Sequence, residues 1–451
     1  MATSQAVQEQ LSSLLSRIQE ARARTDALFQ LLPPNSFYDR PIPERHRLIF
    51  YLGHLETFDW NLLRGPLGLE PFNAEFDKLF AFGIDPVGGG LPTDTPSEWP
   101  DIAHIEKYNG LIRTKLDNRI RNSPGAHETL LHVAIEHRLM HAETLAYLLH
   151  NLPLERKLSP ELAAPDLQPA GSRPAGAPSP KPFQVEIPAG IATLGQPRQG
   201  NRSFGWDNEF EVERISVPRF SMDAYPVTNS EYLKFVHAGG YENSAYWTPE
   251  NWEWKRQQQL EHPYFWVPRS SSAPTDPDKQ WDYRAMFGII PLPLSWPVYV
   301  SHAEASAFAH WAEKKLPTEA QWHRAAYGTS GEFERVYPWG NEHPDPSRGN
   351  FHHERWDATP VDAHPAGASA FGVADMLGNG WEWTSTVFGP LPGFKSFPFY
   401  PGYSADFFDG KHFVMKGGSP RTDACMLRRS FRNWFQPQYS YVYATFRCVE
   451  E

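Results

Sequence analysis

The sequence predicts a mixed α+β protein of two domains, a four-helix bundle followed by a domain of short strands, short helices and loops. Residues 1–152 carry helical hydrophobic periodicity, and residues 183–451 alternate short β-like runs with Gly and Pro. Residues 153–182 lie between them, and seven prolines fall within residues 159–182. Such a composition is typical of a semi-rigid linker that forms no core.

The first domain contains four helical patterns, which together are typical of a four-helix bundle. The first pattern repeats apolar residues at Leu11, Leu14, Leu15, Ile18, Leu28 and Phe29. The second is expected to begin after Pro43, the third near Ser97, and the fourth after residues 124–125. They are expected to end near residues 62, 121 and 150, and the connection over residues 65–96 is long and rich in Gly and Pro.

The second domain is expected to hold strands within residues 183–190, 210–228 and 412–419, and helices over residues 229–236, 302–314 and 318–327. Two aromatic segments, residues 246–255 and 337–345, are expected to be loops that pack through their Trp side chains.

Composition excludes several classes of protein. Aromatic residues make up 14% of the chain, too many for a disordered protein, and a net charge of −11 argues against a nucleic-acid partner. Two cysteines in 451 residues exclude a disulfide framework and fit a reducing cytosol. The polar start lacks a signal-peptide core, and no apolar run approaches the ~18 residues of a membrane span. We therefore expect a soluble, cytoplasmic protein.

Three histidines of the bundle are expected to face inward. His137 and His141 are four residues apart on the fourth helix, so they lie on one face, and His54 on the second helix is flanked by apolar residues. A pair at this spacing is by itself more often incidental than metal-binding. Three buried imidazoles without partners would be costly, and a shared metal ion removes that cost.

The residues alone leave the metal open. Zn²⁺ would give a hydrolytic site with a bound water, whereas Fe²⁺ would give an oxygen-activating site, although the usual iron triad contains one carboxylate. Glu56 and Glu143 could accept a ring N–H, or could equally be solvated helix-face carboxylates. His132 is off the ligand face, and His46 and His150 are expected at the surface.

Several motifs, in the same order along the chain, resemble one family. In the bundle these are GHLE and EHRLMHAET, and in the second domain they are IPAGIATLGQ, FGWDNE, YPVTNSEYLKFV, LPTEAQWHRAAYG, YPWGNE, DMLGNGWEWT, GGSPRTD and RRSFRNWF. Together they resemble the EgtB-type sulfoxide synthases of ergothioneine biosynthesis. The resemblance implies a DinB-like bundle followed by a formylglycine-generating-enzyme-like domain, the sulfatase-modifying-factor type with a C-type-lectin fold.

The resemblance also implies an activity. The family uses O₂ and non-haem iron, Fe²⁺, to join a thiol to C2 of the imidazole of hercynine (Nα-trimethylhistidine) and releases a sulfoxide. By resemblance, His54, His137 and His141 hold the iron, and the second domain carries the substrate pocket. Trp434 and Phe435 are predicted to face the trimethylammonium group, because aromatic faces stabilise such a cation without a hydrogen bond. Asn433 is predicted to bond the imidazole or the carboxylate of hercynine.

The chain departs from the best-known family members at three places. Phe388 or Leu391 stands where a Tyr would donate a proton, and neither can do so. Phe435 and Tyr439 replace an Asp and an Arg of members that use γ-glutamylcysteine, and residues 82–100 lack a clear equivalent of those members' basic residue. Met140 replaces a Gln that contacts hercynine.

These departures predict a smaller sulfur donor and a different proton donor. The two carboxylates of γ-glutamylcysteine need Arg partners, so free cysteine is the expected donor, although another small thiol stays open. Tyr51 or Tyr108 would have to replace the missing acid. Formylglycine generation itself is excluded, because Cys425 and Cys448 do not form a reactive pair and both are expected to be structural.

Three alternatives stay open at this point. A selenoneine synthase would share the architecture and hercynine but use a selenosugar. A Zn-dependent DinB-type thiol transferase would use the bundle alone. A lectin-like second domain without catalytic function would make the protein a binding module.

Overall fold

The computed structural model describes residues 2–81, 92–122, 127–159, 179–199, 203–269, 280–331 and 333–451, with side chains from residue 12 onward. The chain divides into two compact units, Met1–Ala164 and Pro165–Glu451, which we call the helical unit and the mixed unit. The division falls inside the predicted linker, of which residues 160–178 lie outside the described part. The predicted domain limits at residues 152 and 183 stay predictions.

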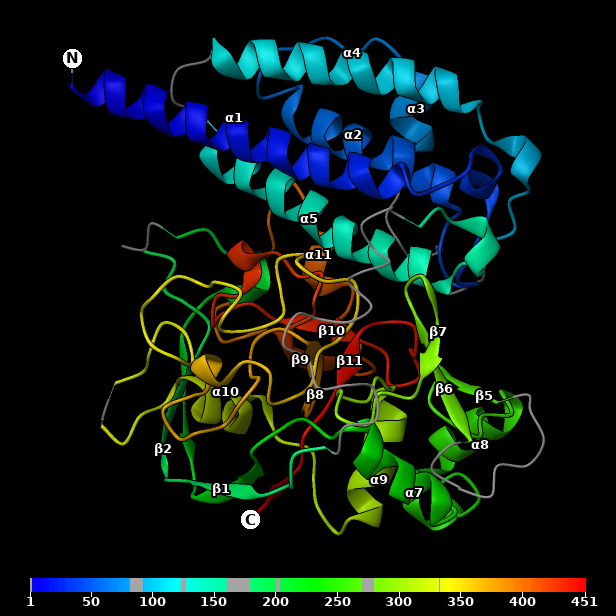
Figure 1. Ribbon diagram of the computed structural model, residues 1–451. Helices are drawn as coiled ribbons and strands as arrows, with labels where there is room; N and C mark the ends of the chain where they lie inside the picture. Colours follow the sequence, from blue (N-terminus) through cyan, green and yellow to red (C-terminus); the bar gives the residue numbers. More distant parts are fainter. Residues whose placement is uncertain are drawn as a thin grey trace. The chain divides into compact units, whose positions relative to one another are not determined.

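The helical unit is built on four long helices, α1 (Ala2–Phe29), α2 (Leu48–Leu63), α4 (Ile102–Arg121) and α5 (Glu128–Asn151). Helix α1 packs against α4 and α5, and α2 packs against the same two helices, so the four form a bundle (Figure 1). The predicted apolar stripe of α1 is buried from Leu14 onward, whereas the side chain of Leu11 is outside the described residues.

Two helix starts were predicted too early. Helix α2 begins at Leu48 and not directly after Pro43, because the backbone N–H of Leu48 bonds to the carbonyl of Asp39 and closes a loop before the helix. Helix α4 begins at Ile102 and not near Ser97. Pro100 disfavours helical geometry at the residue before it, and Trp99 is extended, with ψ of 143°.

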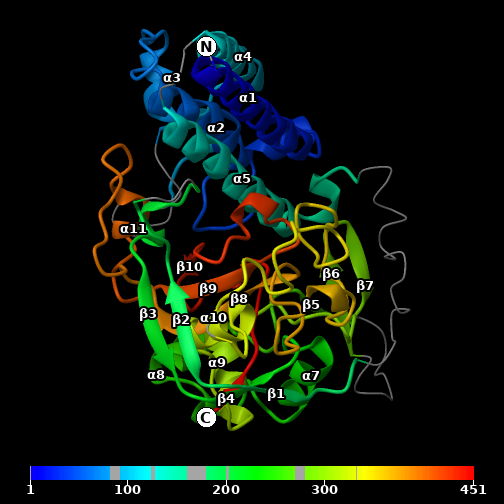
Figure 2. The ribbon, with the colours of Figure 1, turned by 90° about the vertical axis from the view of Figure 1, so that its left-hand side faces the viewer.

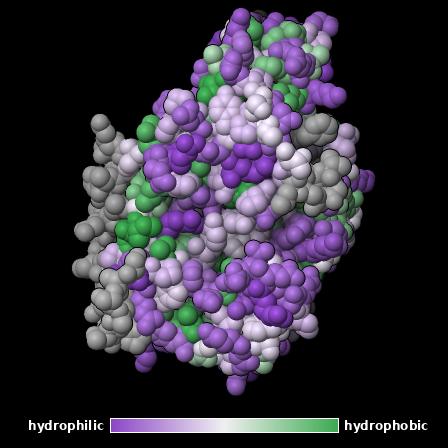
Figure 3. Space-filling view, turned by 90° about the vertical axis from the view of Figure 1, so that its right-hand side faces the viewer, coloured by the Kyte–Doolittle hydropathy of each residue, from purple (hydrophilic) through white to green (hydrophobic). Residues whose placement is uncertain are grey.

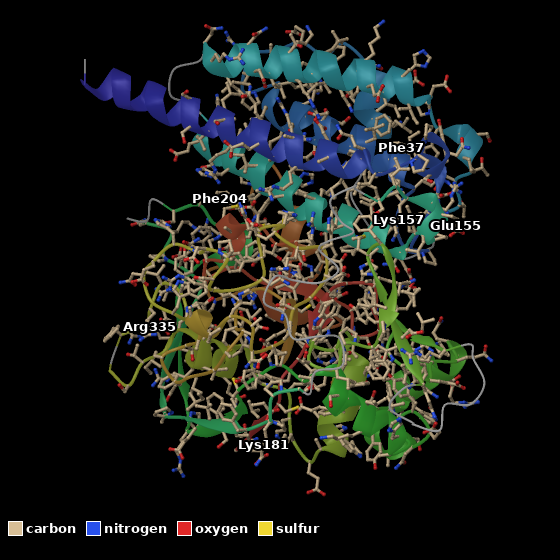
Figure 4. The ribbon with its side chains drawn as sticks, viewed as in Figure 1. Phe37, Glu155, Lys157, Lys181, Phe204 and Arg335 are labelled. Carbon is tan, nitrogen blue, oxygen red and sulfur yellow. The ribbon has the colours of Figure 1, made fainter. Side chains whose placement is uncertain are left out.

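Shorter elements lie between and after these helices. The connection from α2 to α4 contains α3 (Ala74–Leu79), whose start is capped by the Asn73 side chain accepting from the Phe76 N–H. In the described part of this unit, 3-10 turns form at η1 (Pro34–Tyr38), η2 (Pro96–Glu98) and η3 (Leu154–Arg156). Beyond α5, Lys157 (labelled in Figure 4) donates its Nζ to the Leu149 carbonyl at 2.8 Å and closes the helix end.

The described residues of the mixed unit form four small sheets. The largest has the order β10-β9-β8-β11, in which β8 and β9 are antiparallel and β11 is parallel to β8. The others are β1-β4-β12, β5-β6-β7 and the ribbon β2-β3, visible in Figure 2, and all their pairings are antiparallel. The strands are β1 (Gln184–Ile187), β2 (Gly190–Leu194), β3 (Glu213–Val217), β4 (Phe220–Asp223), β5 (Trp266–Pro268), β6 (Trp281–Ala285), β7 (Gly288–Pro291), β8 (Gly380–Val387), β9 (Phe413–Gly418), β10 (Asn433–Phe435), β11 (Ala444–Thr445) and β12 (Val449–Glu450).

The helices of the mixed unit are short. They are α7 (Asn229–His237), α8 (Pro249–Gln257), α9 (His302–Trp311), α10 (Glu319–Tyr327) and α11 (Gly402–Ala405), with 3-10 turns η4 (Asp207–Glu209), η5 (Ser244–Tyr246), η7 (Pro365–Gly367) and η8 (Ala424–Met426). The predicted strands and the three predicted helices are confirmed. The predicted aromatic loop over residues 246–255 is wrong, because Thr248 caps α8 by accepting from the Asn251 N–H and Pro249 occupies the first turn.

Buried aromatic and charged side chains hold the mixed unit together. Trp322 on α10 donates to the Glu382 carboxylate on β8 at 2.9 Å, and the Arg447 guanidinium lies 2.7 Å from the same carboxylate. All three side chains are fully buried, so this cluster joins α10, β8 and the end of the chain. On the face drawn in Figure 3 hydrophilic residues predominate and apolar ones are scattered. The mixed α+β prediction is confirmed.

Within the described ranges, every helix is too short or too polar to cross a lipid bilayer.

Candidate metal centre

Three histidines of the helical unit meet in one buried cluster, as the sequence predicted. His54 comes from α2, and His137 and His141 come from successive turns of α5. One ring nitrogen of each lies within 4.8 Å of those of the other two. The side chains are 2%, 4% and 2% exposed, so the cluster is closed off from bulk water.

The electrostatics of the cluster keep its imidazoles neutral. Burial, opposed by the bond to the Phe80 carbonyl, lowers the pKa of His54 to about 4. Burial and the neighbouring imidazoles lower the pKa values of His137 and His141 well below their usual range. At neutral pH the three rings therefore offer lone pairs, which is the form that binds a metal ion.

The cluster contains buried ring nitrogens that a bound metal ion would satisfy. Nε2 of His54 and Nδ1 of His137 and of His141 are buried and have no hydrogen-bond partner among the described residues. Leaving three buried polar nitrogens unsatisfied is costly, and a shared cation would satisfy nitrogens of this kind. The donor set of three neutral imidazoles suits Zn²⁺ or Fe²⁺.

Aromatic side chains fix the planes of the three rings. Phe58 stacks on His137 with 3.4 Å between ring centroids and 9° between planes, and Phe50 stacks on His54 at 4.8 Å. Tyr51 lies beside His141, with 5.7 Å between centroids. Rings packed on their faces lose rotational freedom, so the nitrogens are held in one arrangement before any ion binds.

Glu56 has a role that the sequence did not predict. It is 1% exposed, so it is not a solvated carboxylate, and its Oε1 accepts from Arg113 at 2.8 Å and from Arg138 at 3.0 Å. Arg138 also donates to Asp59 at 2.7 Å. Glu56 is thus part of a buried ion-pair network that joins α2, α4 and α5 and not an acceptor for a ligand imidazole. Glu143 is half-buried on α5.

Two other histidines bear on the ligand assignment. His132, expected off the ligand face, lies 3.7 Å from the Glu128 carboxylate one turn earlier in α5. His150 was expected at the surface, but it is 1% exposed, because the end of α5 is buried on all sides.

The hydrogen-bond partner of His54 was not predicted from the sequence. Its Nδ1 lies 2.7 Å from the backbone carbonyl oxygen of Phe80, in the connection after α3. The available sequence signal was Gly53, directly before His54; in the structure an added Cβ there would lie 2.5 Å from the Phe80 ring.

The predicted proton donors occupy different surroundings. Tyr51 is fully buried next to His141. Tyr108 donates its hydroxyl proton to Asp77 at 2.6 Å, and burial together with this bond raises the pKa of the phenol far above its usual value. Met140 is half-buried directly before His141 on α5.

In the mixed unit, the predicted substrate residues fall into two groups. Trp434 stacks on Phe388 at 4.1 Å and 8°, and Tyr403 and Phe407 lie 5.6 Å from it, so these four form an aromatic cluster. Phe435 instead stacks on Tyr439 at 4.9 Å. Strand alternation explains the separation of Trp434 from Phe435. The Asn433 side-chain oxygen accepts from the Trp434 N–H at 2.8 Å.

The arginines before this strand are engaged with glutamates. Arg428 donates to Glu209 of the FGWDNE motif at 2.8 Å, and the ring of Phe204 (labelled in Figure 4) lies 5.6 Å from its guanidinium. Arg429 pairs with Glu334 at 3.2 Å and Arg432 with Glu319 at 3.0 Å. Each guanidinium is therefore neutralised within the mixed unit.

Comparisons with known proteins place the chain in a family. Residues 172–451 match the family model of the sulfatase-modifying factor enzyme 1-like domain. The hercynine oxygenase of Mycolicibacterium smegmatis is 33% identical over 370 residues, which cover 80% of this chain and 79% of that protein.

Two further relatives align over a smaller share of their own length. The hercynine oxygenase of Mycobacterium tuberculosis is 38% identical over 246 residues, covering 54% of this chain and 55% of that protein. Ergothioneine biosynthesis protein 1 of Neurospora crassa is 28% identical over 500 residues, covering 94% of this chain and 56% of that protein. The chain thus spans about half the length of these two relatives. It belongs to the EgtB-type family of hercynine oxygenases, a family of oxygen-using oxidoreductases with a sulfatase-modifying factor enzyme 1-like domain.

Proposed function

We propose that this protein is an iron- and O₂-dependent sulfoxide synthase of ergothioneine biosynthesis. It would join free cysteine to C2 of the hercynine imidazole and give hercynyl-cysteine sulfoxide. The cluster of three buried, neutral histidines carries the proposal, because it is a ligand set for a redox-active metal in a chain of this family. The names of the mycobacterial relatives support hercynine and oxygen as substrates.

His54, His137 and His141 would hold Fe²⁺. Bound iron would supply O₂ activation and open positions for substrate groups. The protein's own contribution is to keep the imidazoles neutral through burial and to hold their planes through Phe50 and Phe58. Ligands that need no deprotonation and no reorientation bind the ion without a conformational cost.

Residues of the mixed unit would bind hercynine. The aromatic cluster of Phe388, Tyr403, Phe407 and Trp434 provides ring faces and edges suited to a trimethylammonium group. Asn433 carries amide N–H donors for the imidazole or the carboxylate, and Phe435 adds an apolar surface on the other side of β10. Met140, directly before His141, is proposed as an apolar contact for the same substrate.

The charge arrangement favours cysteine as the sulfur donor. A dipeptide donor brings a second carboxylate, which needs an arginine or lysine that is available for pairing. Arg428, Arg429 and Arg432, the basic residues directly before Asn433, are already paired with glutamates. Detaching Arg428 or Arg432 would leave the buried carboxylate of Glu209 or Glu319 without that partner, which is costly.

Tyr51 is the proposed proton donor. Its ring lies beside His141, whereas the hydroxyl of Tyr108 is committed to the Asp77 carboxylate. The family Tyr position in the loop after β8 holds Phe388 or Leu391, which cannot transfer a proton.

A donor competition tests this function. The iron-loaded chain is incubated with hercynine, O₂ and either cysteine or γ-glutamylcysteine, and the product is identified by its mass. We expect the cysteine sulfoxide to form in preference to the dipeptide product. Reaction of the dipeptide alone would overturn the donor assignment, and reaction of a selenosugar alone would indicate a selenoneine synthase. Binding of hercynine without turnover of any donor would overturn the enzymatic function.

A further inference from the structure

The Phe80 carbonyl determines which nitrogen of His54 is available to a metal ion. A carbonyl oxygen can only accept a hydrogen bond, so His54 Nδ1, at 2.7 Å, must be the nitrogen that carries the proton. In the neutral ring Nε2 then carries the lone pair. Nε2 is buried and has no hydrogen-bond partner among the described residues. The bond to Phe80 thus leaves Nε2 as the free donor atom of His54.

Gly53 makes this close approach of the Phe80 segment possible. A Cβ at position 53 would lie 2.5 Å from the Phe80 ring, a distance that real Cβ atoms do not tolerate. The Phe80 ring has little room to retreat, because it is fully buried and packs against Phe50, Phe76 and Trp99. Any side chain at residue 53 would therefore push the Phe80 backbone away from His54.

Helix α3, which directly precedes Phe80, is anchored to the bundle through Asp77. Its carboxylate accepts from the Tyr108 hydroxyl of α4 at 2.6 Å and from the Trp60 indole N–H of α2 at 3.3 Å. The Asp77 carbonyl also accepts from the Asn61 side chain at 3.0 Å. The acceptors of Asp77 therefore hold α3 to both neighbouring helices, three residues before the carbonyl that meets His54.

We propose that α3 and Phe80 form a positioning element for the metal site. The Phe80 carbonyl, admitted by Gly53 and anchored through the Asp77–Tyr108 bond, sets the tautomer and the ring orientation of His54. Gly53, Asp77 and Phe80 are positioning residues, because they act through His54. This inference rests on the three-histidine metal site proposed above. It also gives Tyr108 a role in the site that differs from proton donation.

A matched pair of glycine substitutions tests the inference. Gly53→Ala places a methyl group against the Phe80 ring, whereas Gly110→Ala, in α4, places one where nothing lies within 4 Å. Metal affinity is measured under anaerobic conditions by competition for Fe²⁺ with a chromophoric chelator. We expect Gly53→Ala to weaken binding by about 10- to 100-fold, as is typical when the partner of a metal ligand is lost. Gly110→Ala should bind Fe²⁺ as the unsubstituted chain does.

A spectroscopic readout separates positioning from a general loss of stability. The metal-free chain is labelled with ¹⁵N in histidine only, and the tautomer of His54 is read from its ¹H–¹⁵N correlations, assigned with a His54→Ala variant. The unsubstituted chain should show the Nδ1–H tautomer. Asp77→Ala, which does not touch His54, should lose this fixed tautomer and weaken Fe²⁺ binding in the same direction as Gly53→Ala. Tyr108→Phe is the milder variant if Asp77→Ala does not fold.

The outcomes distinguish this inference from the metal-site proposal. An unchanged tautomer and unchanged Fe²⁺ affinity in both Gly53→Ala and Asp77→Ala, or in Tyr108→Phe where Asp77→Ala does not fold, would overturn the positioning role. If His54→Ala weakens Fe²⁺ binding in that same experiment, the metal site itself stands. Full Fe²⁺ affinity in His54→Ala would instead overturn the metal site, and the positioning inference with it.

Discussion

The ring of Phe58 lies flat on the ring of His137, with 3.4 Å between the centroids and 9° between the planes. Phe58 is one helical turn beyond His54 on α2, so a single helix supplies one of the proposed metal ligands and the side chain that orients another. This arrangement makes metal affinity depend on packing as well as on the ligands themselves.

Phe58→Ala should therefore weaken Fe²⁺ binding without removing a ligand. Loss of the stacked face lets His137 rotate, and we expect affinity to fall by about an order of magnitude. Phe58→Leu keeps most of the apolar volume but not the flat face. It should recover thermal stability more fully than metal affinity, measured by chelator competition. Equal recovery of both properties would contradict an orienting role.

The ion-pair network beside the histidines should be essential for the stability of the bundle. Burial by itself raises the pKa of Glu56, but Arg138, Arg22 and Arg113 together hold that pKa at about 2. Arg138→Met would remove the ion-pair partner of the buried Asp59 carboxylate and one of the three arginines beside Glu56, which would keep Arg22 and Arg113. We expect a loss of about 3–5 kcal/mol in the free energy of unfolding.

The control for this network is an exposed pair of the same chemistry. Arg256, whose side chain is 63% exposed, lies 3.3 Å from Glu253 on α8. Arg256→Ala should change the free energy of unfolding by less than about 1 kcal/mol in urea denaturation. A loss in Arg138→Met as small as that would show that the buried network contributes little.

Asp375 should give the mixed unit a distinctive pH dependence. Burial raises its pKa to about 8, although the Asn379 bond at 2.7 Å and the charge of Arg447 oppose the shift. Between pH ~4 and ~8 the folded state holds a proton that the unfolded chain releases, so this group's contribution to stability is lost as pH rises.

Asp375→Asn cannot ionise but keeps an oxygen that accepts from Asn379, and Asn tolerates the left-handed backbone here, with φ of 57°. The variant should gain stability relative to the unsubstituted chain by up to about 1.4 kcal/mol per pH unit as pH rises through that window. Urea denaturation followed by tryptophan fluorescence measures the difference. Glu253→Gln, at an exposed site, is the control, and a pH-independent difference for Asp375→Asn would contradict the assignment.

Tyr51→Phe and Tyr108→Phe should affect different properties, turnover in the first variant and Fe²⁺ affinity in the second. If Tyr51 donates the proton, Tyr51→Phe should retain Fe²⁺ and lose sulfoxide formation by about 10²–10⁴-fold. Tyr108→Phe should bind Fe²⁺ less tightly but turn over normally for each iron bound, because its hydroxyl anchors Asp77. Normal turnover in Tyr51→Phe would remove Tyr51 as the proton donor.

The sequence predicted the ligand cluster because helical periodicity places side chains on defined faces. His137 and His141 meet His54 for that reason. Periodicity says nothing about backbone groups in a connection, so the Phe80 carbonyl was not predictable, although Gly53 beside a ligand was a usable signal.

The partners of the charged residues were harder to predict from the sequence than the histidine cluster. Glu56 was expected to be a ring acceptor or a solvated carboxylate. Its ion-pair network was not predicted, because its partners Arg113 and Arg138 lie on other helices whose relative register the sequence does not define. In the mixed unit, α8 was missed because its Trp content suggested a loop, although Thr248 and Pro249 form a helix start. The β5-β6-β7 sheet, whose strands are three to five residues long, was not predicted either.

The most direct test of the central claim measures iron content and sulfoxide formation together in single histidine variants. His54→Ala, His137→Ala and His141→Ala are compared with His132→Ala. This control removes an imidazole that lies on α5, as His137 and His141 do, but outside the cluster. We predict one iron per chain and hercynyl-cysteine sulfoxide from the unsubstituted chain and from His132→Ala, and loss of both from the other three. Full iron content together with full activity in any of those three would contradict the three-histidine iron site.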